Sequence, residues 1–411
     1  MQRILRFFRT HWRHVAILLV LFFAMYAAYW TAIQSQFPGY SAAEVLTQGS
    51  STSLQAIWND PLNAPYKLLS WVLFKVGAHQ VWLLRVVSLS LGLLSAVILY
   101  YVLRTTFSRR IAVLAGLLYL SSTGFLHAAH VGEPGILQLL GVTILLAFIP
   151  LYLHIHNKVV SVSLGVVVVA MLLYVPVMPW FVFTAAIVFA KKIRQVFSEL
   201  RVEQKIAFIF IFLCLITPLV RALIATPSIG LGLLGLPQHL PGVIELAHNA
   251  KNLGISLFWH GTGPADSMVV GAPILNGIEI ALIVIGVYVQ CKKPRLKRNY
   301  FILIAMIFMM FIIIFGGGVS YAILTPVFAL LMASGLYFLI EQWQTVFPLN
   351  PVARIIGVAC AVLLVSISVL FHYRSFYVGW PHQKAAHEVF TVPQPTYTHT
   401  IDTRKPSDHT F

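Results

Sequence analysis

Long apolar runs with few or no charges recur along most of this chain. A helix needs about 20 mainly apolar residues to cross a bilayer. The runs that meet or approach this length are 15–33, 81–103, 111–127, 135–153, 159–175, 177–190, 206–224, 271–290, 300–315, 322–340 and 355–371. They predict an all-α polytopic membrane protein with about 11 transmembrane helices, since a helix satisfies its own backbone groups in lipid.

The composition excludes other classes of protein. Apolar residues make up 59% of the chain and charged residues 10%, against about 25% charged residues in soluble domains. A soluble enzyme would carry more charge, and a disordered chain would be far less apolar. The first run is also longer than the apolar core of a signal peptide. We therefore expect it to be retained as a span.

The basic residues predict how the chain is oriented. With the N-terminus in the cytoplasm, the inside segments carry 19 of the 28 Lys and Arg residues and three of the 12 acids. Those inside segments are 1–14, 104–110, 154–158, 191–205, 291–299 and 341–354. Because cytoplasmic loops are enriched in Lys and Arg, this predicts an N-terminus inside and a C-terminus outside. We therefore interpret the distribution of basic residues as a determinant of membrane topology and not as a nucleic-acid-binding surface.

Loop lengths predict which face carries the chemistry. The inside loops are short, whereas 34–66 and 225–270 are long segments on the predicted outer face. We expect residues 1–371 to form one transmembrane domain and 372–411 to form an extracytoplasmic, partly disordered tail. Since binding and catalytic residues concentrate on loops, the working face is predicted to be extracytoplasmic.

Two acids lie at the predicted outer boundary. Glu44 is in the first outer loop, where a solvated loop glutamate is the alternative. Glu133 lies between two spans, and Pro134 suits the start of the next helix, whose dipole would also stabilise an acid there. Glu279 lies in an apolar run. It marks either a functional site or a carboxyl group bonded to a neighbouring helix.

Cations near the same face could meet a lipid phosphate. Lys67 and Arg85 flank the segment that enters the second span. Either could bind phosphate oxygens or extend to lipid headgroups. Asp60 precedes a proline, as turn residues often do. The outer histidines lack HExxH spacing and no DxD motif is visible, so we expect no metal and no other cofactor.

Three motifs between residues 37 and 142 occur in an order found in one known family. They are FPGYSAAEV, then DPLNAPYKLLSWVLFKVG, then LLRVVSLSLGLLSAVILYYVLRTTFSRRIAVLAGLLYLSSTGFLHAAHVGEP. In these motifs the chain resembles the GT-C superfamily of polyprenyl-phosphate-dependent glycosyltransferases, in the branch of protein mannosyltransferases and aminoarabinose transferases.

The resemblance implies roles for the two outer acids. The family's first outer loop usually has an Asp-Glu pair, whose first acid acts as general base on the acceptor. Here the pair reads Ala43-Glu44, so that acid is missing and Glu44 is the candidate. Glu133 matches the second acidic position of the family, where it would hold the acceptor or orient the site.

The resemblance also implies donor contacts. Lys67 and Arg85 match positions that would contact the donor phosphate, and Asp60, Asn63 and Tyr321 are further substrate-binding candidates. The family often has Arg before this tyrosine, whereas this chain has Ser320.

These features predict a plasma-membrane glycosyltransferase. It would move a sugar, with mannose favoured, from a polyprenyl-phosphate carrier to a hydroxyl of a protein, glycan or lipid, with no nucleic-acid partner. The alternatives are a lipid or solute transporter or flippase, and a catalytically inactive relative. Transporters commonly have repeated halves, and no halves repeat here.

Overall fold

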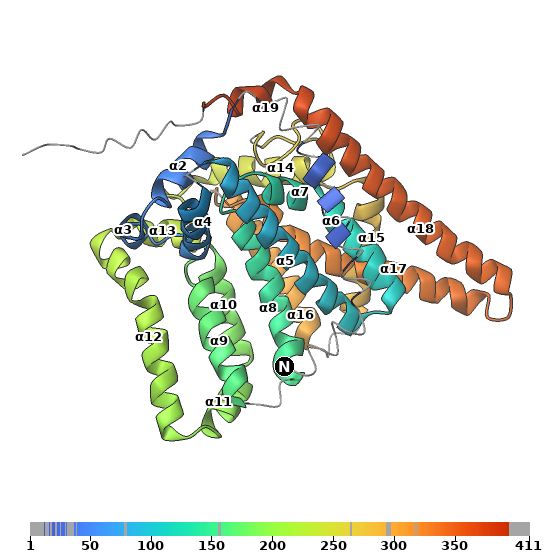
Figure 1. Ribbon diagram of the computed structural model, residues 1–411. Helices are drawn as coiled ribbons and strands as arrows, with labels where there is room; N and C mark the ends of the chain where they lie inside the picture. The colour runs from blue at the N-terminus through green and yellow to red at the C-terminus, as the bar shows by residue number, and fades with distance from the viewer. Residues whose placement is uncertain are drawn as a thin grey trace, which may run out of the picture.

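The computed structural model describes residues 39–77, 80–154, 158–263, 265–292, 297–316 and 319–393, with Phe37 and scattered positions between 12 and 30. This part of the chain is helical, and one isolated antiparallel bridge joins Tyr40 to Val392. The first half of the chain (Figure 1) forms α2 (Ala42–Ser50), α3 (Leu54–Asn59), α4 (Ala64–Gly77), α5 (Trp82–Thr106), α6 (Arg109–Ser121), α7 (Thr123–His130), α8 (Ile136–His154), α9 (Lys158–Leu172), α10 (Met178–Val188) and α11 (Ala190–Ser198). The second half forms α12 (Val202–Ala225), α13 (Ser228–Leu234), α14 (Val243–Phe258), α15 (Gly277–Lys292), α16 (Lys297–Ile314), η2 (Tyr321–Leu324), α17 (Thr325–Val346), α18 (Pro351–Arg374), η3 (Ser375–Gly379), η4 (Trp380–His382) and α19 (Lys384–Val389).

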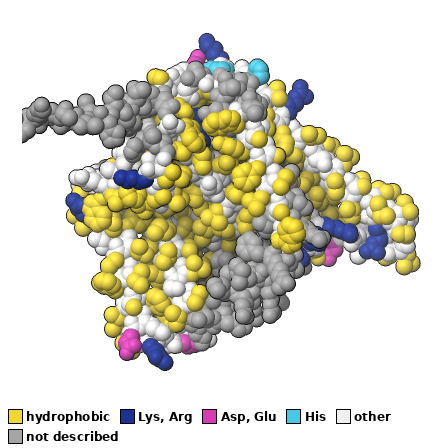
Figure 2. Space-filling view, in the orientation of Figure 1, with side chains coloured by type: hydrophobic (Ala, Val, Ile, Leu, Met, Phe, Trp, Pro, Cys, Tyr) yellow, Lys and Arg dark blue, Asp and Glu magenta, His cyan; other side chains and the backbone are white. Residues whose placement is uncertain are grey.

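In the described part of the chain the apolar runs fold mainly into helices, but not all of these helices are long. Among the described residues, four helical stretches are long and apolar enough to cross a membrane: Trp82–Thr106, Val202–Ala225, Tyr321–Val346 and Pro351–His382. The pair α6 and α7 would make a fifth span, bent by 59°. Hydrophobic side chains cover much of the visible face (Figure 2), as a membrane-embedded protein requires.

The predicted count of 11 spans stays a prediction, as does the orientation. Four further apolar helices are shorter than a full span: Ile136–Phe148, Val159–Leu172, Met178–Val188 and Ile302–Ile314. Most of the first predicted span, 15–33, lies outside the described residues.

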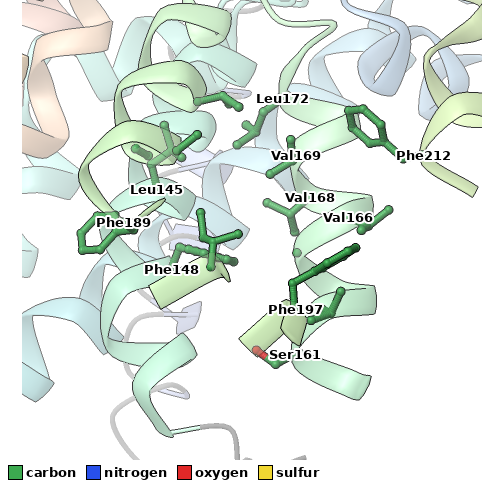
Figure 3. A pocket seen from close by; sticks show the side chains of 16 residues that line it. Leu145, Phe148, Ser161, Val166, Val168, Val169, Leu172, Phe189, Phe197 and Phe212 are labelled. Carbon is green, nitrogen blue, oxygen red and sulfur yellow. The ribbon is translucent and has the colours of Figure 1, made fainter. Parts of the chain in front are cut away.

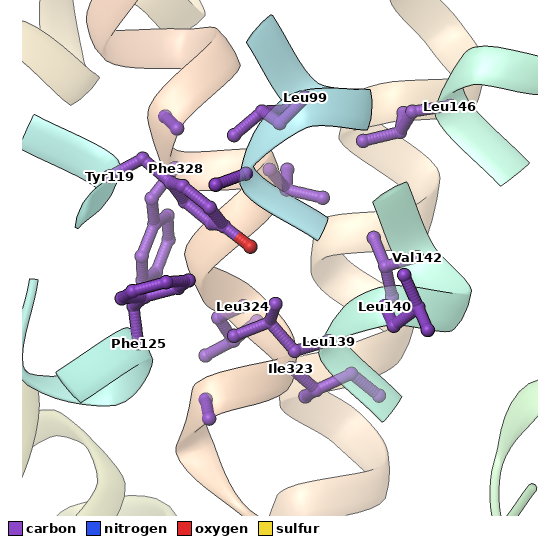
Figure 4. Packing of buried hydrophobic residues seen from close by; sticks show 14 of the residues in the cluster. Leu99, Tyr119, Phe125, Leu139, Leu140, Val142, Leu146, Ile323, Leu324 and Phe328 are labelled. Carbon is purple, nitrogen blue, oxygen red and sulfur yellow. The ribbon is translucent and has the colours of Figure 1, made fainter. Parts of the chain in front are cut away.

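The core lies where α5, α6, α8 and α17 meet. Leu99, Tyr119, Leu139 and Phe328 are buried there and face one another (Figure 4). On its other side α17 lies against α15, with Gly335 and Gly286 at the crossing. A Cβ at either glycine would overlap the backbone of the facing helix. Small residues of this kind let transmembrane helices approach closely.

The two long loops fold into short helices at one end of the bundle. α2, α13 and α14 lie at this end with α7, whereas α11 lies at the opposite end (Figure 1). The predicted outer face is therefore a structured layer and not an open set of loops.

The chain after α18 packs into this layer. Phe376, Trp380 and Phe390 are buried together with Phe37, and the rings of Phe37 and Phe390 lie 4.7 Å apart. Residues 375–392 of the predicted partly disordered tail are thus ordered because their aromatic side chains have an apolar surface to cover. Residues 394–411 lie outside the described residues.

Candidate active site

Glu44 lies in the first turn of α2 and is fully buried. The hydroxyl of Ser41 accepts a hydrogen bond from the Glu44 backbone N–H, and the Glu44 carboxylate accepts one from the Ser41 N–H, both at 3.0 Å. This reciprocal pair is a capping box, which satisfies the free N–H groups at a helix start. The sequence SAAE therefore fixes where α2 begins.

Arg85 binds the same carboxylate from α5. Its Nε lies 2.7 Å from Oε1 of Glu44, and its Nη2 lies 2.9 Å from Oε2. The Arg85 side chain is 1% exposed, and its guanidinium also lies over the ring of Tyr40 at 4.8 Å. Two parallel hydrogen bonds in a buried place make a strong, geometrically specific pair.

A third group completes the surroundings of Glu44. The backbone N–H of Gly132 donates to its Oε1 at 2.8 Å. A Cβ on Gly132 would come within 3.0 Å of this oxygen and 2.8 Å of the Leu84 Cβ, so only glycine fits. The pair Glu44–Arg85 thus joins α2, α5 and the turn before α8, and this carboxylate has no exposed oxygen to offer a substrate.

Glu133 follows in that turn and is linked to the same cluster. The Ser41 hydroxyl donates to its Oε1 at 3.0 Å. The pKa of Glu133 is raised to about 7: burial raises it most, the negative charges of Asp266 and Glu44 also raise it, and the hydrogen bond from Ser41 opposes them. Ser41 is therefore hydrogen-bonded to both predicted acids, Glu44 and Glu133.

Glu133 and Asp266 line one polar cavity of about 390 Å³. Its walls come from the turn before α8, from α14, from the loop after α14 and from the chain between α16 and α17. The other lining residues are mostly polar: Asn249, Asn252, Thr262, Ser267, Ile313, Gly316, Val319, Ser320 and Tyr321. A concave site with converging polar groups and a carboxyl group of shifted pKa is typical of an active site.

Asp266 was not singled out from the sequence. Its backbone carbonyl lies 3.3 Å from Nδ1 of His127, and the neighbouring carbonyl of Ala265 accepts a 2.7 Å hydrogen bond from Trp380 Nε1. Burial raises the pKa of Asp266, and hydrogen bonds from Ser267 oppose that shift. Asp266 could have been found from the sequence because it lies in the long loop 225–270 and is one of few acids on that face.

Tyr321 and Ser320 reach the cavity from the start of η2. The Ser320 hydroxyl accepts the N–H of Ala322 at 3.2 Å and so caps this short helix. The position where the family often has Arg therefore carries a capping serine. Among the lining residues of the cavity there is no Lys or Arg.

Three other predicted site residues are not among the lining residues of this cavity. Lys67 Nζ binds both the carboxylate and the carbonyl of Asp60, at 2.6 and 2.8 Å. Burial lowers the pKa of Lys67, and the contact with Asp60 opposes that shift. Asn63 adopts a left-handed conformation with φ 57° and donates its N–H to the carbonyl of Tyr174 at 2.8 Å. These contacts fix the start of α4.

Glu279 bonds to a neighbouring helix, one of the two alternatives for it. It lies in the first turn of α15, and its carboxylate is 2.9 Å from Nε2 of His372 on α18. It also accepts from Ser368 at 2.8 Å, and His372 Nδ1 lies 3.0 Å from the hydroxyl of Thr123. In the described part of the chain, no group of three or more His, Cys, Asp or Glu is placed to hold a metal.

Comparison with known proteins shows the fold. No protein-family model and no curated protein matches the sequence. Among solved structures, the chain is similar to ArnT from Cupriavidus metallidurans in the apo state, with a TM-score of 0.52, 15% identity, and 91% of this chain and 77% of that chain covered. The structure of ArnT bound to undecaprenyl phosphate gives a TM-score of 0.45 at 14% identity, with 90% and 76% covered. The GT-C type of fold is thus confirmed as an architecture.

Proposed function

We propose that this chain is a membrane glycosyltransferase that moves a sugar from a polyprenyl-phosphate donor to a hydroxyl acceptor. Mannose is the favoured sugar, and the extracytoplasmic side of the plasma membrane the favoured face. The observation that carries the proposal is the polar cavity at the loop end of a GT-C type of fold, with Glu133 in its wall.

Glu133 is the general base in this proposal. Attack of a hydroxyl on an anomeric carbon needs a nearby group that takes the proton, and such a group works best when its pKa is near the operating pH. Burial and the charge of Asp266 bring the pKa of Glu133 to about 7. Glu133 also lines the cavity, whereas the carboxylate of Glu44 is enclosed by Arg85 and Gly132.

Glu44 and Arg85 position that base. Their ion pair holds α2 against α5, and α2 begins at Ser41, which donates to Glu133. We therefore assign Glu44 an indirect role, in place of the proton removal that the family resemblance implied. Rigid support of this kind keeps a reacting group within its productive geometry.

The electrons and the proton balance without a cofactor. The acceptor oxygen bonds to the anomeric carbon, the bond from that carbon to the phosphate oxygen breaks with its electron pair, and the acceptor proton passes to Glu133. Glu133 becomes neutral as the phosphate gains charge, which removes a repulsion from the cavity. Hydrogen-bond donors on Asn252, Thr262 and Tyr321 would hold the phosphate oxygens.

Donor turnover tests the function. Full-length protein in lipid nanodiscs would be given polyprenyl-phosphate sugars labelled in the sugar, mannose first, with serine peptides, glycans and lipids as acceptors. We expect label on an acceptor and stoichiometric release of polyprenyl phosphate. An intact donor moved across a vesicle would indicate a transporter, and binding without cleavage an inactive relative; either result contradicts the proposal.

A further inference from the structure

A second cavity lies away from Glu133 and is almost entirely apolar. It measures about 300 Å³, at the lower end of the range for small-molecule sites. Side chains of α8, α9, α10, α11 and α12 line it, and Figure 3 shows Phe148, Val169, Phe189 and Phe212 around it. Its one polar lining residue is Ser161.

The position of this cavity separates it from the candidate active site. Glu133 lies in the turn before α8, whereas the cavity is lined by Leu145 and Phe148, farther along that helix. It is also lined by α11, which lies at the opposite end of the bundle from α2 and α14 (Figure 1). No residue is shared between the linings of the two cavities.

α11 has two different faces. Ile193 and Phe197, four residues apart and therefore on one side of the helix, line the cavity. Lys191 and Arg194 lie on another side and are exposed. A short helix with an apolar side and a basic side is typical of segments that lie in the headgroup region of a membrane.

The charge around α11 favours an anion. Residues 190–205 contain five basic and two acidic residues. Basic residues beside a membrane attract anionic lipids, and an apolar cavity within a membrane protein can take an acyl chain. Lys and Arg at this end thus complement a negative headgroup, while the cavity complements its hydrocarbon.

We propose that this cavity holds one acyl chain of an anionic phospholipid whose headgroup lies on Lys191 and Arg194. The lipid is a bound component of the bundle, distinct from the sugar donor, and its binding does not depend on sugar transfer. It fills the space between α9, α10 and α11.

Lipid retention tests this site. Full-length protein would be exchanged into nanodiscs that contain equal amounts of phosphatidylglycerol and phosphatidylcholine. It would then be extracted into a mild detergent, and native mass spectrometry would count the phospholipids that stay bound. We expect one retained phosphatidylglycerol per chain. Ala186→Phe, at an exposed lining position, should fill the cavity, and Lys191→Gln with Arg194→Gln should remove the charge; each should lower retention at least fivefold.

A matched variant distinguishes the site from general attraction. Arg354→Gln removes an exposed positive charge on α18, which does not line the cavity, and should leave retention unchanged. Thermal unfolding would check that each variant is folded. Equal retention of the two lipids, loss in Arg354→Gln as large as in the α11 variants, or displacement of phosphatidylglycerol by polyprenyl phosphate would overturn the proposal.

Discussion

Glu133 owes its proposed chemistry to its neighbours. Burial and the charges of Asp266 and Glu44 disfavour its ionised form, and the hydrogen bond from Ser41 favours it. A carboxyl group that exchanges its proton near neutral pH can serve as a base. The carboxylate of Glu44 is instead enclosed by Arg85 and Gly132, out of contact with the cavity.

The pH dependence of transfer should follow this arrangement. The base acts when deprotonated, so kcat/KM should rise with pH and reach half its plateau near pH 7. Asp266→Asn removes a charge that raises the pKa of Glu133 and should move this midpoint to lower pH. Ser41→Ala removes a hydrogen bond that lowers the pKa and should move it to higher pH. Shifts in the same direction for both variants would contradict the assignment.

The sequence indicated the residue types better than their roles. Glu133 could be placed at the site because it lies between two spans on the predicted outer face, and Tyr321 because of the family resemblance. The pairing of Glu44 with Arg85 could not be predicted from the sequence, because residues 41 positions apart leave no local pattern that shows their contact. Asp266 was missed for the same reason: its loop reaches the cavity through contacts made far along the chain.

At the scale of elements, one buried ion pair joins three segments. Glu44 and Arg85 connect α2 to α5, and Gly132 adds the turn before α8. Removing one partner leaves the other charge buried and unpaired. This joint is therefore expected to be sensitive to substitution.

Arg85→Met should be strongly destabilising. Loss of one partner of a buried pair costs roughly 3–5 kcal/mol, so unfolding of the purified protein in detergent should occur at a clearly lower temperature. The double variant with Glu44→Gln should recover part of the loss. Arg374→Met removes an exposed arginine near the end of α18 and serves as the control. Equal unfolding temperatures for the two arginine variants would refute the role of the pair.

The segment after α18 positions the loop that carries Asp266. Trp380 donates to the carbonyl of Ala265 at 2.7 Å, and Gln383 exchanges hydrogen bonds with the backbone of Val270. The same segment reaches the first loop through the bridge between Tyr40 and Val392.

Trp380→Phe should keep most of the packing and remove that hydrogen bond. The unpaired Ala265 carbonyl would loosen the loop, so kcat should fall several-fold, and the pH midpoint should drop as Asp266 moves from Glu133. Trp259→Phe, at a side chain that is 78% exposed, is the control. Unchanged kcat and midpoint in Trp380→Phe would show that the segment has no positioning role.

For the whole molecule, hydropathy predicted the class of fold because lipid imposes it. Where the structure describes the apolar runs they are mainly helical, and ArnT shares the architecture at 15% identity. Hydropathy could not predict the break at Ser122, where α6 and α7 bend by 59°, since the composition on both sides is apolar. Nor could it predict that residues 375–392 pack over the loops, because that depends on a distant aromatic surface.

The predicted orientation is tested by labelling from one side. In a variant whose three cysteines are replaced by serine, Thr52→Cys introduces a thiol at a partly exposed position and Gln195→Cys introduces one at an exposed position. A membrane-impermeant maleimide applied to intact cells should label position 52 and not position 195. Labelling of position 195 without permeabilisation would show that the orientation is the opposite of the predicted one.

The role of Glu133 as the general base is tested most directly by comparing donor turnover of Glu133→Gln with that of the parent protein. Loss of a general base lowers the rate by about 10²–10⁴-fold, while the amide keeps the size of the side chain. Glu245→Gln, an exposed acid on α14, is the control and should retain full activity. We predict a loss of at least 100-fold confined to Glu133→Gln. If a folded Glu133→Gln protein transferred sugar at the parent rate, Glu133 would not be the general base.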